Sequence, residues 1–242
     1  MRPKSVRHDR RVRAHSTAAW EDITFVERHP MSKLTKLTLT LAFSTSGVAI
    51  LDAVLGGITG EPTVLAAESG MSLPLLLGSL LHAATYIALA LLLHVHRDRI
   101  DIGSRTRRVL RIGLEVAYVL MAMFFGPVVI GAGATGADPA KIPDLLTLPA
   151  ALGFVGLFLF TITLGTALLR VPGMRLPALV LTGVTAGIGL TTLLGALDSS
   201  FAHPAYPEAL AYIGTALIGV GSVPRPGDRQ LNPDRRTVRP ST

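Results

Sequence analysis

The sequence contains no cysteine, little charge and few aromatic residues, with a single tryptophan. Without cysteine the chain forms no disulfide, thiolate zinc site, iron–sulfur cluster or cysteine nucleophile. It also lacks the HExxH, GxSxG and phosphate-loop motifs, and only one histidine, His82, lies deep enough in an apolar run to ligate an intramembrane haem. These absences predict a protein that is not an enzyme and that has no resident metal or cofactor.

Charged residues make up only 16% of the 242 residues, whereas soluble proteins carry about 25%. Hydrophobic residues make up 49%, and the formal net charge is +7. Residues 1–33 and 223–242 hold 13 Lys and Arg against 6 Asp and Glu, while residues 34–222 hold 10 of each. The basic excess therefore belongs to two tails and not to a nucleic-acid-binding domain.

Long uncharged runs fill the middle of the chain. The runs that follow Lys36, Glu68, Glu115, Asp144 and Arg175 contain 15, 28, 22, 25 and 22 residues. A helix needs about 20 apolar residues to cross the hydrocarbon core, so five spans follow at once. A sixth run, between Glu208 and Arg225, has only 16 uncharged residues. The spans we predict lie at about 34–57, 72–95, 109–132, 145–169, 176–197 and 204–222.

The distribution of basic residues favours six spans over five, because Lys and Arg concentrate in short cytoplasmic segments. With six spans and both termini inside, 22 of the 23 Lys and Arg are cytoplasmic, and Lys141 is the exception. The fold class we predict is an all-α integral membrane protein, a bundle of six transmembrane helices with cytoplasmic termini. Residues 34–222 form the bundle, and residues 1–33 and 223–242 are basic tails with too little apolar surface to fold. Arginine outnumbers lysine 19 to 4, a bias typical of GC-rich bacterial genomes, so we expect a bacterial cytoplasmic membrane.

Ionisable side chains at membrane depth are costly and mark candidate sites. At about 1.5 Å per residue, Asp52 lies about 24 Å and His82 about 18 Å above the side that carries the basic residues. The two can meet if their helices are neighbours, and a carboxylate beside an imidazole is typical of proton relays in transporters. The alternative is that Asp52 reaches the outer interface and His82 bonds to a neighbouring helix.

Glu115 lies only about 6 Å above the same side, too low to join that pair. Its spacing predicts an i, i+4 ion pair with Arg111, and Tyr86 lies near the level of Tyr118. At the other side, Asp198, His203 and Glu208 could be drawn together as a metal site, but their spacing matches no compact ligand motif, so we predict none.

Two further features concern packing. Gly183 and Gly187 form a GxxxG motif that lets helices approach closely, either within the bundle or in a homodimer. Pro127 falls within the third span and should kink it. The loop from Arg97 to Arg111 lacks interleaved aromatic residues, so anionic lipid headgroups explain it better than nucleic acid does. The basic residues of this loop are Arg97, Arg99, Arg105, Arg107, Arg108 and Arg111.

Two function hypotheses follow. The first is a permease, or a permease subunit, for a small solute or ion, with Asp52 and His82 as the proton relay. The second is a non-transporting membrane scaffold or accessory protein whose basic tails bind lipid or a partner protein. A cavity that reaches Asp52 and His82 would favour the first hypothesis, and a solidly packed bundle would favour the second.

Overall fold

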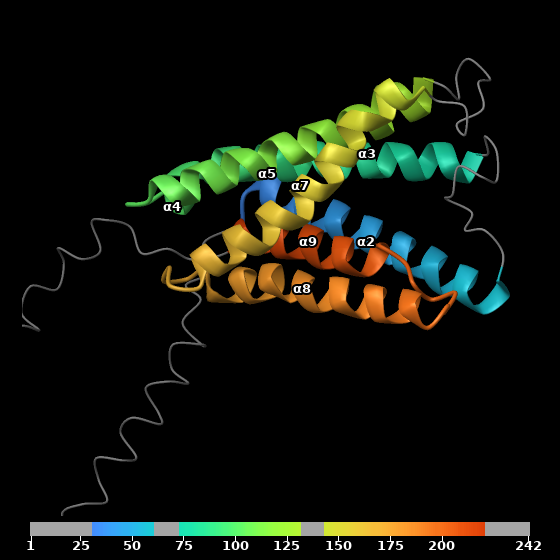
Figure 1. Cartoon of the computed structure of the whole chain (residues 1–242). Helices are drawn as coiled ribbons and strands as arrows, with labels where there is room; N and C mark the ends of the chain where they lie inside the picture. The colour runs from blue at the N-terminus through green and yellow to red at the C-terminus, as the bar shows by residue number, and fades with distance from the viewer. Residues whose placement is uncertain (1–30, 61–72, 132–142, 221–242) are drawn as a thin grey trace, which may run out of the picture. The chain divides into compact units, whose positions relative to one another are not determined.

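The computed structural model describes residues 31–60, 73–131 and 143–220, and these residues form helices and connecting turns without a strand (Figure 1). The predicted tails therefore lie almost wholly outside the described residues. The helices in chain order are α2 (Lys33–Thr59), α3 (Leu73–Val95), α4 (Arg97–Ile100), α5 (Arg105–Met123), the π-helix η2 (Phe124–Ile130), α7 (Asp144–Leu168), α8 (Arg175–Ala196) and α9 (Ala205–Ile218).

Local capping explains where several of these helices begin and end. The Ser32 hydroxyl accepts a hydrogen bond from the Thr35 amide at the start of α2, and Ser104 does the same for Arg107 at the start of α5. Such caps satisfy amides that have no partner within the helix. Gly60 ends α2 with a φ of 70°, a conformation that glycine adopts without strain.

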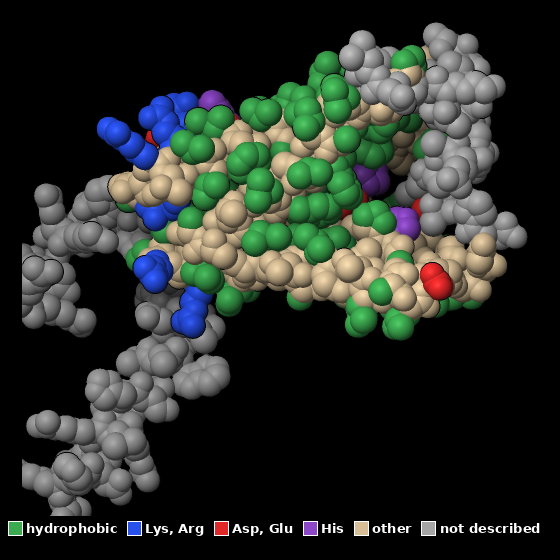
Figure 2. Space-filling model, in the orientation of Figure 1, with side chains coloured by type: hydrophobic (Ala, Val, Ile, Leu, Met, Phe, Trp, Pro, Cys, Tyr) green, Lys and Arg blue, Asp and Glu red, His purple; other side chains and the backbone are tan. Residues whose placement is uncertain are grey.

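Five helical stretches are long and apolar enough to cross a membrane: Lys33–Thr59, Leu75–Val95, Arg105–Ile130, Thr147–Leu168 and Arg175–Ala196. Their outward faces carry many exposed large apolar side chains, among them Leu51, Leu80 and Val155 (Figure 2). Soluble monomers rarely expose apolar patches larger than a few hundred Å². This all-helical structure is therefore compatible with a multi-pass membrane protein.

The helices run alternately in opposite directions, so the turns that carry basic residues meet at one end (Figure 1). We call this the Arg-rich end, and Figure 2 shows Lys and Arg gathered there. The described Lys and Arg belong to the start of α2, to the connection from α3 to α5 and the first turns of α5, and to the connection between α7 and α8. They are Lys33, Lys36, Arg97, Arg99, Arg105, Arg107, Arg108, Arg111, Arg170 and Arg175.

Helix α9 corresponds to the sixth predicted span, but it has only 14 residues. At about 1.5 Å per residue it is about 21 Å long, shorter than the roughly 30 Å of hydrocarbon. It packs against α8 and α2 and also contacts α3 and α7, so it lies inside the bundle. Its residues Ala211, Ala216 and Ile218 are fully buried. The five longer helices are candidate spans, and the sixth crossing stays a prediction.

Small residues set the closest helix contacts. A Cβ atom added at Gly165 of α7 would lie 2.7 Å from the Cβ of Leu181 and 3.0 Å from the backbone nitrogen of Thr182, both on α8. One added at Gly187 would lie 3.0 Å from the Cα of Pro207 on α9, whereas nothing lies within 4 Å of one at Gly183. Gly187 therefore contacts α9 within the bundle, whereas Gly183 has no such contact, and its role in a homodimer stays a prediction.

Pro127 lies inside η2, where the helix that began at Arg105 changes from α to π geometry. Proline has no N–H to donate and its ring clashes with the preceding turn. A π-helical turn accommodates both effects and re-aims the side chains next to it. The predicted distortion of the third span is thus present as η2, and it positions Phe124 and Phe125.

We predict that Gly165→Ala lowers the stability of the bundle, because the added methyl group meets the α8 backbone. Overpacking of this kind costs about 1 to 3 kcal/mol. Gly183→Ala is the matched control, since its methyl group enters open space. Thermal unfolding of the two purified proteins in the same detergent should show a lower midpoint for Gly165→Ala only. Equal midpoints would contradict the close approach of α7 and α8.

Candidate functional site

A cavity of about 460 Å³ lies within the bundle, away from the Arg-rich end. Residues from α2, α3, α5, η2, α7 and the start of α9 form its wall. The polar residues of the wall are Asp52, Ser79, His82, His203 and Glu208, and the apolar ones are Ala49, Leu75, Gly78, Met121, Phe124, Phe125, Ala150, Ala151, Phe154, Pro204 and Ala205.

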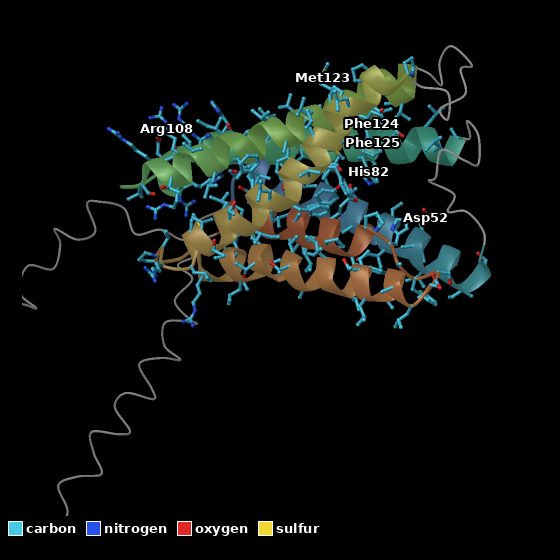
Figure 3. All side chains as sticks on the ribbon, in the orientation of Figure 1. Asp52, His82, Arg108, Met123, Phe124 and Phe125 are labelled. Carbon is cyan, nitrogen blue, oxygen red and sulfur yellow. The ribbon has the colours of Figure 1, made fainter. Side chains whose placement is uncertain are left out.

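Asp52 and His82, the pair singled out from the sequence, both line this cavity. They come from neighbouring helices, because the hydroxyls of Thr45 on α2 and Thr85 on α3 are 2.6 Å apart. Each of the two side chains is 8% exposed. Figure 3 shows Asp52 on α2 and His82 on α3 in the same half of the bundle, with Arg108 at the opposite end.

The ring of His82 contacts its own helix and three aromatic rings, those of Tyr86, Phe125 and Tyr212. Its Nδ1 is 2.8 Å from the carbonyl oxygen of Gly78 one turn earlier, and since a carbonyl only accepts, Nδ1 donates. Its ring stacks on Phe125 of η2, with centroids 5.1 Å apart and planes 20° apart (Figure 3). With Nδ1 engaged in this way, Nε2 is the nitrogen left to accept or pass on a proton.

His203 and Glu208 also belong to the cavity, whereas the sequence analysis considered them only as members of a metal site and did not predict one. His203 lies close enough to Asp52 to feel its charge. Its Nδ1 accepts a hydrogen bond from the Ala205 amide at 3.1 Å, which requires a ring nitrogen without a proton. Glu208 lies inside the predicted sixth span, so the rule that flagged Asp52 could have flagged this carboxylate too.

The connection between α8 and α9, residues 197–204, brings His203 to the cavity. It starts at the end of α8 and turns back into the bundle (Figure 1). Ser200 donates to the carbonyl of Gly57 at 2.8 Å, and Thr191 of α8 donates to the carbonyl of His203 at 3.2 Å. Two residues of this segment, His203 and Pro204, belong to the cavity wall.

The carboxyl group of Glu208 lies next to hydroxyl groups from two helices, those of Tyr86 on α3 and Tyr212 on α9. The Tyr212 hydroxyl donates its one proton to the Tyr86 hydroxyl at 2.6 Å. The Tyr86 proton is therefore the one left to interact with the carboxyl group.

A second hydroxyl pair lies nearer the Arg-rich end. The hydroxyls of Tyr118 on α5 and Thr215 on α9 are 2.8 Å apart. The rings of Tyr86 and Tyr118 have centroids 5.9 Å apart, consistent with the similar depths expected from the sequence. The tyrosines thus form a buried polar layer beneath the cavity.

Glu115 lies in a separate ionic cluster at the Arg-rich end. Arg111 is 4% exposed and donates to Glu115 at 2.6 Å and to both carboxylate oxygens of Asp101 at 3.0 Å. The Arg111 to Glu115 pair expected from the i, i+4 spacing is therefore present. Arg107 donates to the carbonyl oxygens of Ile100 and Ile102, so it too is engaged within the protein.

The same end contains His96, whose Nδ1 lies 2.9 Å from the Leu92 carbonyl. Burial lowers the pKa of His96, against the opposing effect of this hydrogen bond. His96 is therefore neutral at neutral pH and adds nothing to the positive charge. The exposed described cations of this end are Lys33, Lys36, Arg97, Arg105, Arg108, Arg170 and Arg175.

Asp198, His203 and Glu208 do not assemble into a metal site. Asp198 is exposed, at a φ of 50°, in the turn after α8, whereas His203 and Glu208 face the cavity. Within residues 31–60, 73–131 and 143–220, no three His, Asp or Glu side chains are grouped as ligands of one ion.

Comparison with protein-family models, with curated proteins and with solved structures found no match for this chain.

We predict that Arg111→Gln destabilises the protein by about 2 kcal/mol, because it leaves Asp101 and Glu115 without their shared cation. This is between the values for exposed and fully buried ion pairs, as suits carboxylate side chains 21% and 17% exposed. Arg108→Gln, at an exposed position on the same helix, should leave stability unchanged. Thermal unfolding of both variants in detergent checks this, and equal midpoints would show that the cluster contributes nothing.

Proposed function

We propose that this protein is a permease, or a permease subunit, for a small solute or ion, and not an enzyme. The observation that carries the proposal is the cavity, which brings Asp52, His82 and Glu208 together among helices apolar enough to cross a membrane. Ionisable groups are retained at membrane depth mainly where they serve substrate, ion or proton pathways. A scaffold that required only packing would gain nothing from such a cavity.

The proposal includes six crossings, with both termini on the cytoplasmic side of a bacterial cytoplasmic membrane. Residues 197–204 and α9 together form the sixth crossing, part non-helical and part helical. Broken spans of this kind build the binding sites of many transporters, because the unwound backbone lies beside the substrate. The grouping of described Lys and Arg at one end supports the orientation through the positive-inside rule.

We further propose that the Arg-rich end binds anionic lipid headgroups. Two of the six arginines of the loop are less available to lipid headgroups. Arg107 and Arg111 are engaged in hydrogen bonds within the protein. The remaining cations, each worth about 1 kcal/mol near an anionic surface, are Arg97, Arg99, Arg105 and Arg108.

The proton relay is the mechanism we propose for coupling. Asp52 and His82 line one cavity, and His82 Nε2 is the nitrogen available for exchange once Nδ1 donates to Gly78. A proton that enters the cavity can move between carboxylate and imidazole because both groups face the same space.

We predict that the cavity is reached by water-soluble reagents. Because the chain has no cysteine, Ala49→Cys introduces a single thiol into the cavity wall. Leu51→Cys is the control, since Leu51 lies on the same helix but is 59% exposed on the apolar surface. Only a hydrated thiol ionises and reacts, so a charged methanethiosulfonate should modify Ala49→Cys in membranes and leave Leu51→Cys unmodified. Lack of reaction at both positions would favour the scaffold alternative.

We also predict that Asp52→Asn and His82→Ala each abolish pH-dependent proton flux. The measurement uses proteoliposomes with an internal pH-sensitive dye and an imposed potassium diffusion potential. Asp198→Asn, a change at an exposed carboxylate outside the cavity wall, should leave the flux intact. Flux that persists in both cavity variants would refute the relay, as would wild-type flux no greater than that of protein-free liposomes.

A further inference from the structure

The described wall of the cavity contains two carboxyl groups, those of Asp52 and Glu208, and neither lysine nor arginine. His203 is held neutral, since its Nδ1 accepts the Ala205 amide. A carboxylate in a low-dielectric cavity is stabilised by a cation that comes to it. The charge of the wall therefore selects a positively charged occupant over an anion.

The remainder of the wall is apolar and aromatic. Phe124 and Phe125 of η2 and Phe154 of α7 line the cavity, and the Phe125 ring stacks on His82. Aromatic faces attract cations and also bury apolar surface. A fully hydrated inorganic ion would leave these surfaces unused, whereas an organic cation with an apolar body would contact both the rings and the carboxyl groups.

Ser79 supplies a third, independent observation. It is 2% exposed, belongs to the cavity wall, and its hydroxyl oxygen has no hydrogen-bond partner. A buried hydroxyl without a partner costs free energy and calls for an explanation. Because one staggered rotation about Cα–Cβ re-aims the oxygen, an occupant with N–H donors can supply the missing bond. A quaternary ammonium group cannot.

We propose that the cavity binds a protonated primary amine attached to a small apolar body, with Asp52 and Glu208 as counter-charges and Ser79 as acceptor. This deepens the permease proposal and rests on it for the role of the cavity in transport. A volume of about 460 Å³ is within the range of small-molecule sites.

Equilibrium dialysis of the full-length protein in detergent, with phenethylamine as probe, tests the site. We expect saturable binding of phenethylamine and at least tenfold weaker binding of 2-phenylethanol and of phenylacetate, which lack the positive charge. Asp52→Asn and Glu208→Gln should each weaken phenethylamine at least tenfold. Asp198→Asn is the matched control, because asparagine tolerates the positive φ of that exposed position, and it should bind as the wild type does.

Ser79→Ala separates the hydroxyl contact from the charge. It should weaken phenethylamine about threefold or more and leave phenethyltrimethylammonium, which has no N–H donor, unchanged. Equal weakening of both probes would show that the substitution acts through packing and would remove Ser79 from the site.

A protection assay keeps the test decisive if a cavity variant fails to fold. Phenethylamine should slow the modification of Ala49→Cys by a methanethiosulfonate, and phenylacetate should not. Tight binding of 2-phenylethanol or phenylacetate, or wild-type affinity in both carboxyl variants, would overturn the amine assignment. If phenethylamine binds but radiolabelled phenethylamine is not taken up by proteoliposomes, the permease proposal fails and the site stands. If the methanethiosulfonate modifies Ala49→Cys and phenethylamine does not slow the reaction, the amine site is refuted. The cavity is then still reached by water-soluble reagents, as the permease proposal requires.

Discussion

The constraint on which this bundle depends is the cost of leaving backbone polar groups unpaired among apolar helices, because in a membrane the partners must come from the protein itself. The segment from residue 197 to 204 has the greatest need of such partners, because its backbone is not helical and α9 begins only at Ala205. Ser200 and Thr191 tie it to α2 and α8. The longer helices pack around α9. The alanines and Gly214 of α9 allow close contact, since a Cβ atom at Gly214 would lie 3.0 Å from the backbone nitrogen of Leu181. The cavity lies where this irregular segment meets α3 and η2.

Much of this architecture is readable from the sequence, because apolar runs and basic turns reflect the membrane directly. The five long helices, the Arg111 to Glu115 pair and the distortion at Pro127 follow from run length, helical spacing and proline chemistry. Which helices are neighbours does not follow from such patterns. The sequence placed Asp52 and His82 at compatible depths, but only the packing of α2 on α3 brings them to one cavity.

The elements that sequence reasoning missed share one physical cause. The count of uncharged residues treats each span as a straight helix, so it leaves residues 198–203 between the fifth and sixth predicted spans without a place in the bundle. In the structure that turn descends into the bundle and carries His203 with it. The GxxxG motif is used unequally within the bundle: Gly187 contacts α9, and a Cβ atom at Gly183 would enter open space. A GxxxG spacing predicts that another helix can approach closely, but it does not predict which helix packs there.

The two groups of buried carboxyl side chains differ in whether a cation of the protein neutralises them. We use this difference to distinguish structural carboxyl groups from candidate functional ones. At the Arg-rich end, Asp101 and Glu115 share the cation Arg111, so the cluster is complete within the protein. In the cavity, Glu208 lies beside the hydroxyls of Tyr86 and Tyr212, which are neutral and cancel no charge. Burying a carboxyl group without a cation is costly, and an apolar residue at position 208 would pack without that cost. In our proposal, a carboxyl group that faces a cavity whose described wall holds no Lys or Arg is available to a cation from outside, whether a proton or a protonated amine.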